Sequence, residues 1–316
     1  MEGYSFRPSK DEYANKTLLI ALAGTTGSGK TESAMRIARG IVGTQGKFAV
    51  IDTENRRALN KRSRYEFDHL DFRAPYSPDN FKGAIDAAER AKYGALVVDN
   101  FSHEWFGEGG CSDIQEEALE KMSKGDMDKA VKLTALAWKA PKQSHKKLMY
   151  RILQCVVPVI FCLRAEPKIK FVKDENGKMQ VIDAAWQPIC EKMFGYEMLI
   201  YALLMPDKPG VPIQLKKLEP EFEIILPVGK QIDEEVGKRL KEWAAGGTKP
   251  ESKDYIPPPL AEKTKEDFPA IMASEQKRLG DEKFFGILGA HGFERIEEIT
   301  QRAKQITIYR ELSAIK

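Results

Sequence analysis

The sequence predicts an α/β protein with a mostly parallel sheet, followed by a small helical unit. Strand-like runs alternate with helical patterns along most of the chain, and the runs are apolar throughout, as in sheets covered by helices on both faces. A polar segment rich in Pro and Lys follows, after which apolar residues return at helical spacing. We therefore expect an N-terminal extension (1–15), a main domain (16–246), a linker (247–266) and a small helical domain (267–316).

The composition limits the class of protein. A chain of 316 residues with 42% hydrophobic and 31% charged residues is typical of a globular protein. Its formal net charge of +3 is too small to imply an anionic partner, so nucleic-acid binding would depend on local patches. No apolar stretch approaches ~20 residues and no signal-peptide core is present, so we expect no membrane partner and a cytoplasmic location. The four cysteines lack metal-ligand spacing, and Cys155 and Cys162 are expected in the core.

The elements of the main domain follow in order along the chain. We expect strands at 17–24, 47–54, 69–77, 94–102 and 156–166. Helices are expected at 31–42 and 77–92, and a mostly helical pattern covers 114–154. Ser77 and Pro78 supply an N-cap and a first helical residue for the second of these helices.

The pattern changes after the last of these strands. Residues 168–183 predict a β-hairpin that turns at 175–178. Further strands are expected within 196–205 and 212–226. A closing helix over 233–246 begins at the cap Asp233 and stops at Gly246.

The segment from Gly24 to Thr31, GTTGSGKT, fits the pattern G-x-x-x-x-G-K-[ST] and lies between a strand and a helix. In such a loop the glycines let backbone N–H groups approach phosphates, Lys30 reaches the β/γ oxygens, and the Thr31 hydroxyl ligates Mg²⁺. The loop therefore predicts ATP and Mg²⁺ as ligands. The expected nucleotide contacts are Gly24, Thr25, Thr26, Gly27, Ser28, Gly29, Lys30, Thr31 and Glu32.

Two carboxylates are candidates for the remaining chemistry. Asp99 ends a strand, where its carboxylate would hold the Mg²⁺ through water, although it is also a possible turn or cap residue. Glu54, which is 24 residues after Lys30 at the end of the second strand, is the best candidate to orient the attacking water. The alternative for Glu54 is a surface carboxylate at a strand end. Asp52 points to the other side of that strand and is expected to be structural.

The order of these motifs resembles the core of RecA-type ATPases over roughly residues 15–245. The segments that carry the resemblance, besides the phosphate loop, are VIDTEN, VVDN and VIFCLR. The resemblance implies Glu54 as the catalytic carboxylate, whereas AAA+ machines usually place theirs directly after the strand-end Asp, where this chain has Asn100. The segment VVDNFSHEWFGEGG is similar to phage-encoded RecA-like ATPases of recombination modules. That similarity implies ATP hydrolysis coupled to single-stranded DNA in phage recombination or repair.

The resemblance also implies roles for residues beyond the phosphate loop. Arg164 occupies a strand end where RecA-type proteins carry a γ-phosphate sensor, usually Gln; the alternative is an ion pair with Glu166. Lysines on a late strand of RecA-type filaments reach the neighbouring subunit's ATP, which implies a homo-oligomer, ring or filament, with Lys217 favoured over Lys216. The alternative is a solvated edge strand.

Several features keep two interpretations each. The predicted hairpin carries four lysines and one aromatic residue, which suits a DNA strand but also a solvated surface. These residues are Lys168, Lys170, Lys173, Lys178 and Phe171. His103 and Glu104 either assist catalysis near the metal or shape the turn, and the basic run 60–64 either contacts phosphates or is a solvated loop. The C-terminal unit is either a docking module or a packing element.

Two other classes of function stay open. Small-molecule kinases and other phosphotransferases share the phosphate loop, but they usually carry an Arg-rich lid, and no clear one is found. A non-hydrolysing nucleotide switch is disfavoured by Glu54.

Overall fold

A computed structural model describes residues 17–173, 179–246, 268–293 and 295–299, and then residues 305, 308, 309, 311 and 312. The chain divides into two compact units, Met1–Lys253 and Asp254–Lys316. The predicted N-terminal extension, the predicted linker and the predicted hairpin turn lie outside the described residues.

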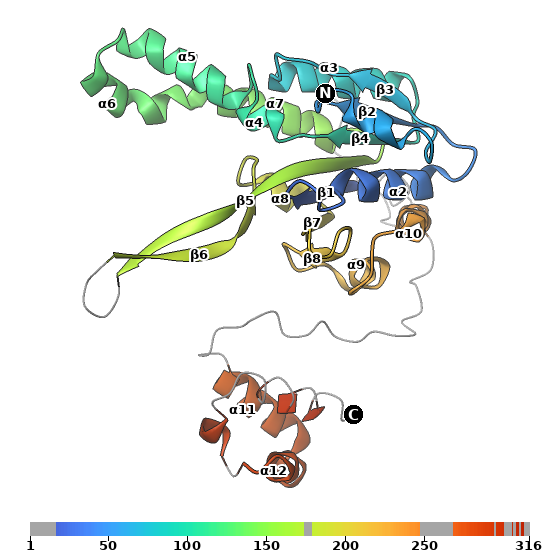
Figure 1. Cartoon of the computed structure of the whole chain (residues 1–316), viewed down its shortest axis with the longest axis vertical. Helices are drawn as coiled ribbons and strands as arrows, with labels where there is room; N and C mark the ends of the chain where they lie inside the picture. The colour runs from blue at the N-terminus through green and yellow to red at the C-terminus, as the bar shows by residue number, and fades with distance from the viewer. Residues whose placement is uncertain are drawn as a thin grey trace, which may run out of the picture. The chain divides into compact units, whose positions relative to one another are not determined.

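The first unit is built on a sheet with the strand order β3-β2-β4-β5-β1-β7-β8, and β6 pairs with β5 (Figure 1). The strands are β1 (Leu19–Gly24), β2 (Phe48–Asp52), β3 (Asp68–Asp71), β4 (Ala95–Asp99), β5 (Val159–Lys173), β6 (Met179–Pro188), β7 (Ile200–Leu204) and β8 (Pro212–Gln214). The pairs from β3 to β7 along this order are parallel, whereas β6 and β8 are antiparallel to their neighbours. The mostly parallel α/β fold is thus confirmed.

Helices cover both faces of this sheet, as the apolar strands require (Figure 1). One face packs against α2 (Lys30–Val42), α9 (Pro220–Ile225) and α10 (Glu234–Ala244). The other packs against α3 (Pro78–Arg90), α7 (Lys139–Leu153) and α8 (Phe194–Glu197). Successive residues of β1 serve the two cores in turn: Ile20 and Leu22 join the first, Leu19 and Ala21 the second.

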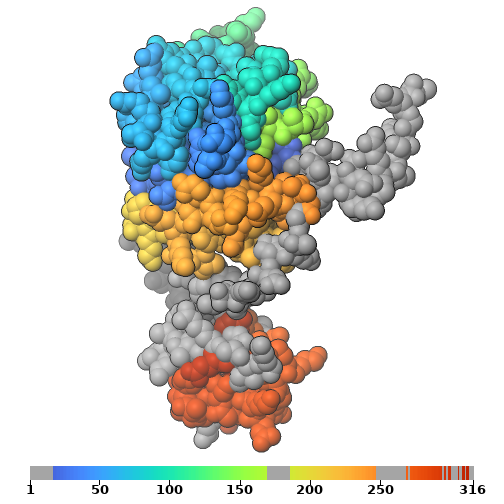
Figure 2. All heavy atoms as spheres, turned by 90° about the vertical axis from the view of Figure 1, so that its right-hand side faces the viewer, coloured from blue at the N-terminus to red at the C-terminus, as the bar shows by residue number. Residues whose placement is uncertain are grey.

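Two helices of the first face approach each other very closely. A Cβ built on Gly40 of α2 would lie 1.9 Å from the Glu234 carbonyl oxygen, and one on Gly237 of α10 would lie 2.1 Å from that of Ile37. Only glycine allows this contact. The space-filling view shows α10, in orange, lying against the blue N-terminal part of the domain (Figure 2).

The predicted helical stretch after β4 consists of several helices. They are the short α4 (His103–Phe106), then α5 (Cys111–Ser123), α6 (Met127–Ala137) and α7. The caps expected from the sequence are also present: Ser77 accepts a hydrogen bond from the Asn80 N–H in α3, and Asp233 accepts one from the Val236 N–H in α10.

Two sequence-based expectations need correction. Residues 212–226 do not form one strand, because β8 ends at Gln214 and α9 begins at Pro220, a favourable first helical residue. Phe222 and Ile225 lie one helical turn apart and are both buried, which gives α9 its contact with the core. In addition, the strand at 156–166 and the hairpin are continuous, since β5 runs unbroken from Val159 to Lys173 and pairs with β6 in the expected hairpin.

The second unit is helical. It contains α11 (Phe268–Leu279), α12 (Asp281–Ala290) and the short 3₁₀ helix η4 (Ile296–Glu298). Its core is formed by Phe268, Met272, Phe284, Leu288, Ile299, Ile308 and Leu312.

Candidate active site

The phosphate loop connects β1 to the first residue of α2, and its shape depends on glycine. Gly27 and Gly29 have φ of 80° and 86°, in the left-handed region that disfavours other residues. A Cβ on Gly24 would lie 2.3 Å from the Leu204 carbonyl oxygen on neighbouring β7. The loop therefore presents the N-terminus of a 13-residue helix, where backbone N–H groups and the helix dipole favour an anion.

Lys30 lies folded against this loop. Its Nζ donates to the carbonyl oxygens of Gly24 and Thr25, at 2.9 and 2.7 Å. Burial lowers the pKa of Lys30, against the opposing charges of Asp99 and Glu54. An incoming phosphate would restore the pKa by supplying negative charge.

Thr31 and Asp99 meet at the base of the loop. The Thr31 hydroxyl donates to Asp99 Oδ2 at 2.5 Å, and Asp99 is 5% exposed. Burial raises the pKa of Asp99, although the Thr31 hydrogen bond acts in the opposite direction. A hydroxyl and a carboxylate side by side supply the oxygen ligands that Mg²⁺ prefers, so these two residues fit the ion.

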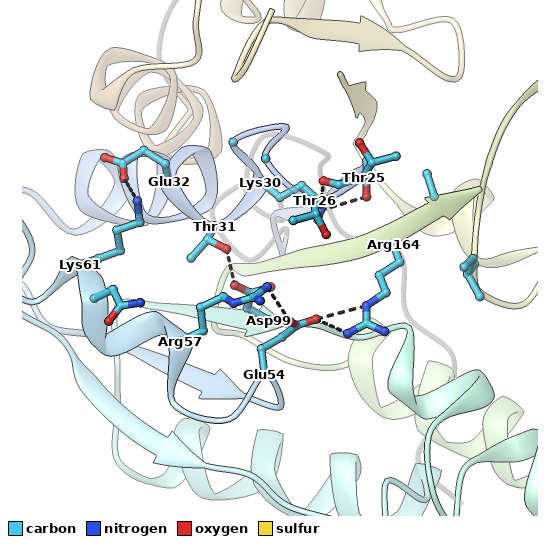
Figure 3. Close-up of a pocket in the computed structure, with 16 residues that line it drawn as sticks. Thr25, Thr26, Lys30, Thr31, Glu32, Glu54, Arg57, Lys61, Asp99 and Arg164 are labelled. Atoms are coloured by element: carbon cyan, nitrogen blue, oxygen red, sulfur yellow. Dashed lines mark hydrogen bonds and ion pairs between the residues drawn. The ribbon is translucent and has the colours of Figure 1, made fainter. Parts of the chain in front are cut away.

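Glu54 lies two residues after the end of β2 and is held by several donors (Figure 3). Its Oε1 accepts from Arg164 Nη2 at 2.6 Å, Arg164 Nε at 3.2 Å and Asn100 Nδ2 at 2.8 Å. Its Oε2 accepts from Arg57 Nη1 at 3.0 Å. Burial alone would raise the pKa of Glu54, but the hydrogen bonds from Asn100 and Arg164 hold it below 4.5. Glu54 is therefore an ionised acceptor at neutral pH.

The order of the strands explains how these groups meet. β5 lies between β1 and β4, and β2 lies beside β4. Gly24 is level with Arg164, and Asp52 with Asp99, at the carboxyl edge of the sheet. Arg164 pairs with Glu54, so the alternative of an ion pair with Glu166 is wrong.

These residues line a cavity of about 860 Å³, within the size range of ligand sites. The lining consists of Gly24, Thr25, Thr26, Gly27, Gly29, Lys30, Thr31, Glu32, Glu54, Arg57, Asn60, Lys61, Asp99, Arg164, Ala165 and Ile189. Two expected site residues do not line it: Ser28, which is buried and bonds the Thr25 carbonyl oxygen, and Lys217.

Arg57, Asn60 and Lys61 also line the cavity; Asn60 and Lys61 belong to the basic run 60–64, and Arg57 precedes it. All three lie on the 3₁₀ helix η2 (Arg57–Lys61), which begins three residues after Glu54. Glu32 of α2 fixes this segment, since its carboxylate contacts Lys61 Nζ at 2.8 Å and Arg64 Nη2 at 2.9 Å. The basic residues that follow Glu54 are the sequence signal for this part of the cavity lining.

Asp52 has the structural role expected for it. Its carboxylate accepts from the N–H groups of Glu54 and Ala58, at 2.7 and 2.9 Å, and it lies 3.1 Å from His69 Nε2. Since Asp52 is buried, these contacts fix the backbone turn that carries Glu54 over the cavity.

The adjacent residues His103 and Glu104 contact different partners. His103 Nδ1 lies 2.7 Å from Thr53 Oγ1, in the residue before Glu54, and its ring stacks on Tyr76. Glu104 is buried and contacts His145 instead, so the expectation that both stand close to the metal is wrong for Glu104.

The two late lysines also differ. Both follow β8 and do not lie on a strand. Lys216 is half-buried and donates to the Met198 carbonyl oxygen of its own chain, and burial lowers its pKa. Lys217 is exposed.

Taken together, the fold and the phosphate loop define a nucleotide-binding protein of the P-loop ATPase class. A family model described as an AAA domain matches residues 16–193, more than half of the chain. The chain therefore belongs to this AAA domain family, whose members are nucleotide-binding ATPases. No curated protein is similar enough to count as a match. Among the described residues, no helix has the length and apolar character needed to cross a membrane.

Proposed function

We propose that the protein is a Mg²⁺-dependent, RecA-like ATPase that acts on single-stranded DNA in phage recombination or repair. The observation that carries the catalytic part is the meeting of Lys30, Asp99, Glu54 and Arg164 at one cavity beneath a complete phosphate loop. These groups come from four neighbouring elements at one edge of the sheet.

The phosphates of ATP would bind at the N-terminus of α2, where Lys30 exchanges its loop carbonyl contacts for phosphate oxygens. Thr31 and Asp99 would hold the Mg²⁺, which supplies charge neutralisation at the β- and γ-phosphates. Arg164 lines the same cavity and is the candidate contact to the γ-phosphate.

Glu54 is the candidate to orient the attacking water. Its ionised carboxylate is an acceptor for a water proton, and its contacts with Arg164 and Asn100 fix its position. Arg164 contacts Glu54 and also lines the cavity, so a bound γ-phosphate would compete with Glu54 for the guanidinium. That competition would leave the carboxylate available for water only when ATP is present.

The DNA part of the proposal depends on the β5–β6 hairpin. Figure 1 shows β5 and β6 leaving the body of the sheet as a two-stranded ribbon. Lys168 is exposed on it; the side chains of the other predicted DNA contacts, residues 170, 171, 173 and 178, lie outside the described residues. Basic residues with an aromatic residue are typical of single-strand binding, and the resemblance to RecA-type proteins supports the same placement.

The exposure of Lys217 is the observation that supports the proposed assembly into a ring or filament. Lys217 is exposed, whereas Lys216 is engaged within its own chain, so Lys217 is the better candidate to reach the ATP of a neighbouring subunit. Size-exclusion chromatography with and without ATP tests this part separately from hydrolysis, since a monomer under both conditions would remove it.

Steady-state ATP hydrolysis by the purified chain, with and without single-stranded DNA, tests the main proposal. We expect Mg²⁺-dependent phosphate release that DNA stimulates several-fold. Hydrolysis indifferent to DNA would leave an ATPase and remove the DNA role. Transfer of phosphate to an added small-molecule acceptor in place of water would instead indicate a phosphotransferase.

A further inference from the structure

Three buried side chains outside the nucleotide cavity meet between α4, α5 and α7. They are Glu104, Cys111 and His145, which are 1%, 0% and 5% exposed. His145 Nδ1 lies 2.9 Å from Glu104 Oε1, and Cys111 Sγ lies 3.4 Å from the same oxygen. The three ligand atoms all lie within 4.8 Å of one another, and none of these residues lines the nucleotide cavity.

The glycine-rich turn between α4 and α5 brings Cys111 onto Glu104. A Cβ on Gly110 would lie 2.7 Å from the His103 carbonyl oxygen and 2.8 Å from that of Glu104. Gly109, with φ of 72°, is also in the left-handed region. The turn is thus shaped so that a thiol meets a carboxylate only seven residues earlier in the chain, and α7 adds an imidazole from the other side.

The three donor atoms are a thiol sulfur, an imidazole nitrogen and a carboxylate oxygen, the set that suits Zn²⁺. Tetrahedral coordination at usual bond lengths places N and O about 3.3 Å apart, and S and O about 3.5 Å apart. The observed separations of 2.9 and 3.4 Å need only small outward shifts to match. We propose that Glu104, Cys111 and His145 bind one Zn²⁺ ion, with the fourth coordination position left to water.

The exchange balances in charge. Starting from an imidazolium–carboxylate pair and a neutral thiol, one divalent ion replaces the Cys111 thiol proton and the proton on His145 Nδ1, and two protons leave. His145 keeps its proton on Nε2. The net charge of the buried cluster is therefore the same before and after binding, so the ion adds no uncompensated buried charge.

The cluster meets a cavity at one of its three side chains, His145. Trp105, which stacks on Trp138, meets the His145 ring edge-on at 5.9 Å. His145 lines a second cavity of about 350 Å³, whose charged lining residues are Lys142, Lys146, Glu191 and Glu197. An ion and a water molecule as fourth ligand would therefore enter from the His145 side.

A bound ion would tie the α4–α5 turn to α7. His103 precedes Glu104 and contacts Thr53, the residue before Glu54. The ion would therefore also help to fix the position of the segment that carries Glu54. The site does not depend on the proposed ATPase mechanism, because none of its three side chains takes part in it.

Metal retention by the full chain, carrying no His-rich tag, tests the proposal. The protein is stripped with a chelator, incubated with Zn²⁺ or Co²⁺ and passed through gel filtration before the metal is quantified. We expect about one ion per chain, and with Co²⁺ a thiolate-to-metal charge-transfer absorption. Cys111→Ala and His145→Ala should lose both, whereas Cys155→Ala, which removes a buried thiol elsewhere, should keep both.

A wild-type chain that retains no Zn²⁺, or that binds Co²⁺ without the thiolate band, overturns the proposal and leaves a hydrogen-bonded triad. Equal metal content in Cys111→Ala and Cys155→Ala does so as well. The wild-type spectrum decides the outcome even if a variant fails to fold.

Discussion

Replacing Glu54 with Gln separates its catalytic role from its structural one. The amide keeps the shape of the side chain and its Oε1, so Asn100 and Arg164 retain an acceptor, although the Arg164 contact loses its charge assistance. The Arg57 contact is lost because the new amide group donates where the carboxylate accepted.

The structural cost follows from these contacts. The Arg57 side chain is 60% exposed and that of Arg164 is 42% exposed, so solvent screening limits the two losses together to about 1–2 kcal/mol. A domain of ordinary stability stays folded after such a loss. Loss of a group that orients water costs about 10²–10⁴ in rate, or roughly 3–5 kcal/mol of barrier.

The assay combines steady-state phosphate release, the Kd of a fluorescent ATP analogue and the Tm. We expect Glu54→Gln to bind nucleotide near the wild-type Kd with a kcat reduced at least about 100-fold. Glu89→Gln is the matched control: it also neutralises an ion-paired carboxylate, but in α3 and away from the cavity, and its kcat should be unchanged. The reasoning fails if Glu54→Gln binds ATP and hydrolyses it within about threefold of wild type.

Three further results are expected. Gly24→Ala places a Cβ 2.3 Å from the Leu204 carbonyl oxygen, so it should lower the free energy of unfolding by about 1–3 kcal/mol and weaken nucleotide binding. A denaturant titration and a Kd measurement check this, and an unchanged midpoint and Kd would contradict it. Because the folded-state pKa of Glu54 is lowered from 4.5, its stabilising contribution is present above that pH and is lost as the pH falls through the folded pKa. Acid unfolding of Glu54→Gln should therefore depend less steeply on pH in that window, and parallel curves would refute it. Lys217→Ala should reduce ATP hydrolysis only at concentrations where the chain assembles, so an equal loss in the monomer would exclude action across an interface.

The sequence predicts best what is local. Gly24, Gly29, Lys30 and Thr31 lie within eight residues, and their spacing alone sets the loop. Asp99 could be placed as well, because the carboxyl ends of parallel strands share one edge of the sheet.

What depends on strand order was harder to predict. The partner of Arg164 is Glu54, 110 residues earlier, and the two meet only because β4 lies between β5 and β2. From the sequence alone, Glu166 is the more obvious partner for Arg164, because it is only two residues away. The meeting of Cys111 and His145 depends on helix packing instead: they are 34 residues apart, with no spacing typical of metal ligands, and α5 packs against α7.

The α9 segment was missed for a different reason. Its apolar residues are consistent with a strand, but Pro220 lacks the backbone donor that a strand would use and suits the first turn of a helix.

The length of β5 affects how far its outer end could move. The nine residues from Ala165 to Lys173 extend about 30 Å past Arg164 at the usual rise per residue. The register with β6 shifts between Pro167 and Lys168, only three residues past Arg164. Because Ala165 lines the nucleotide cavity, a rotation of a few degrees at this register shift would displace the far end of the ribbon by ångströms.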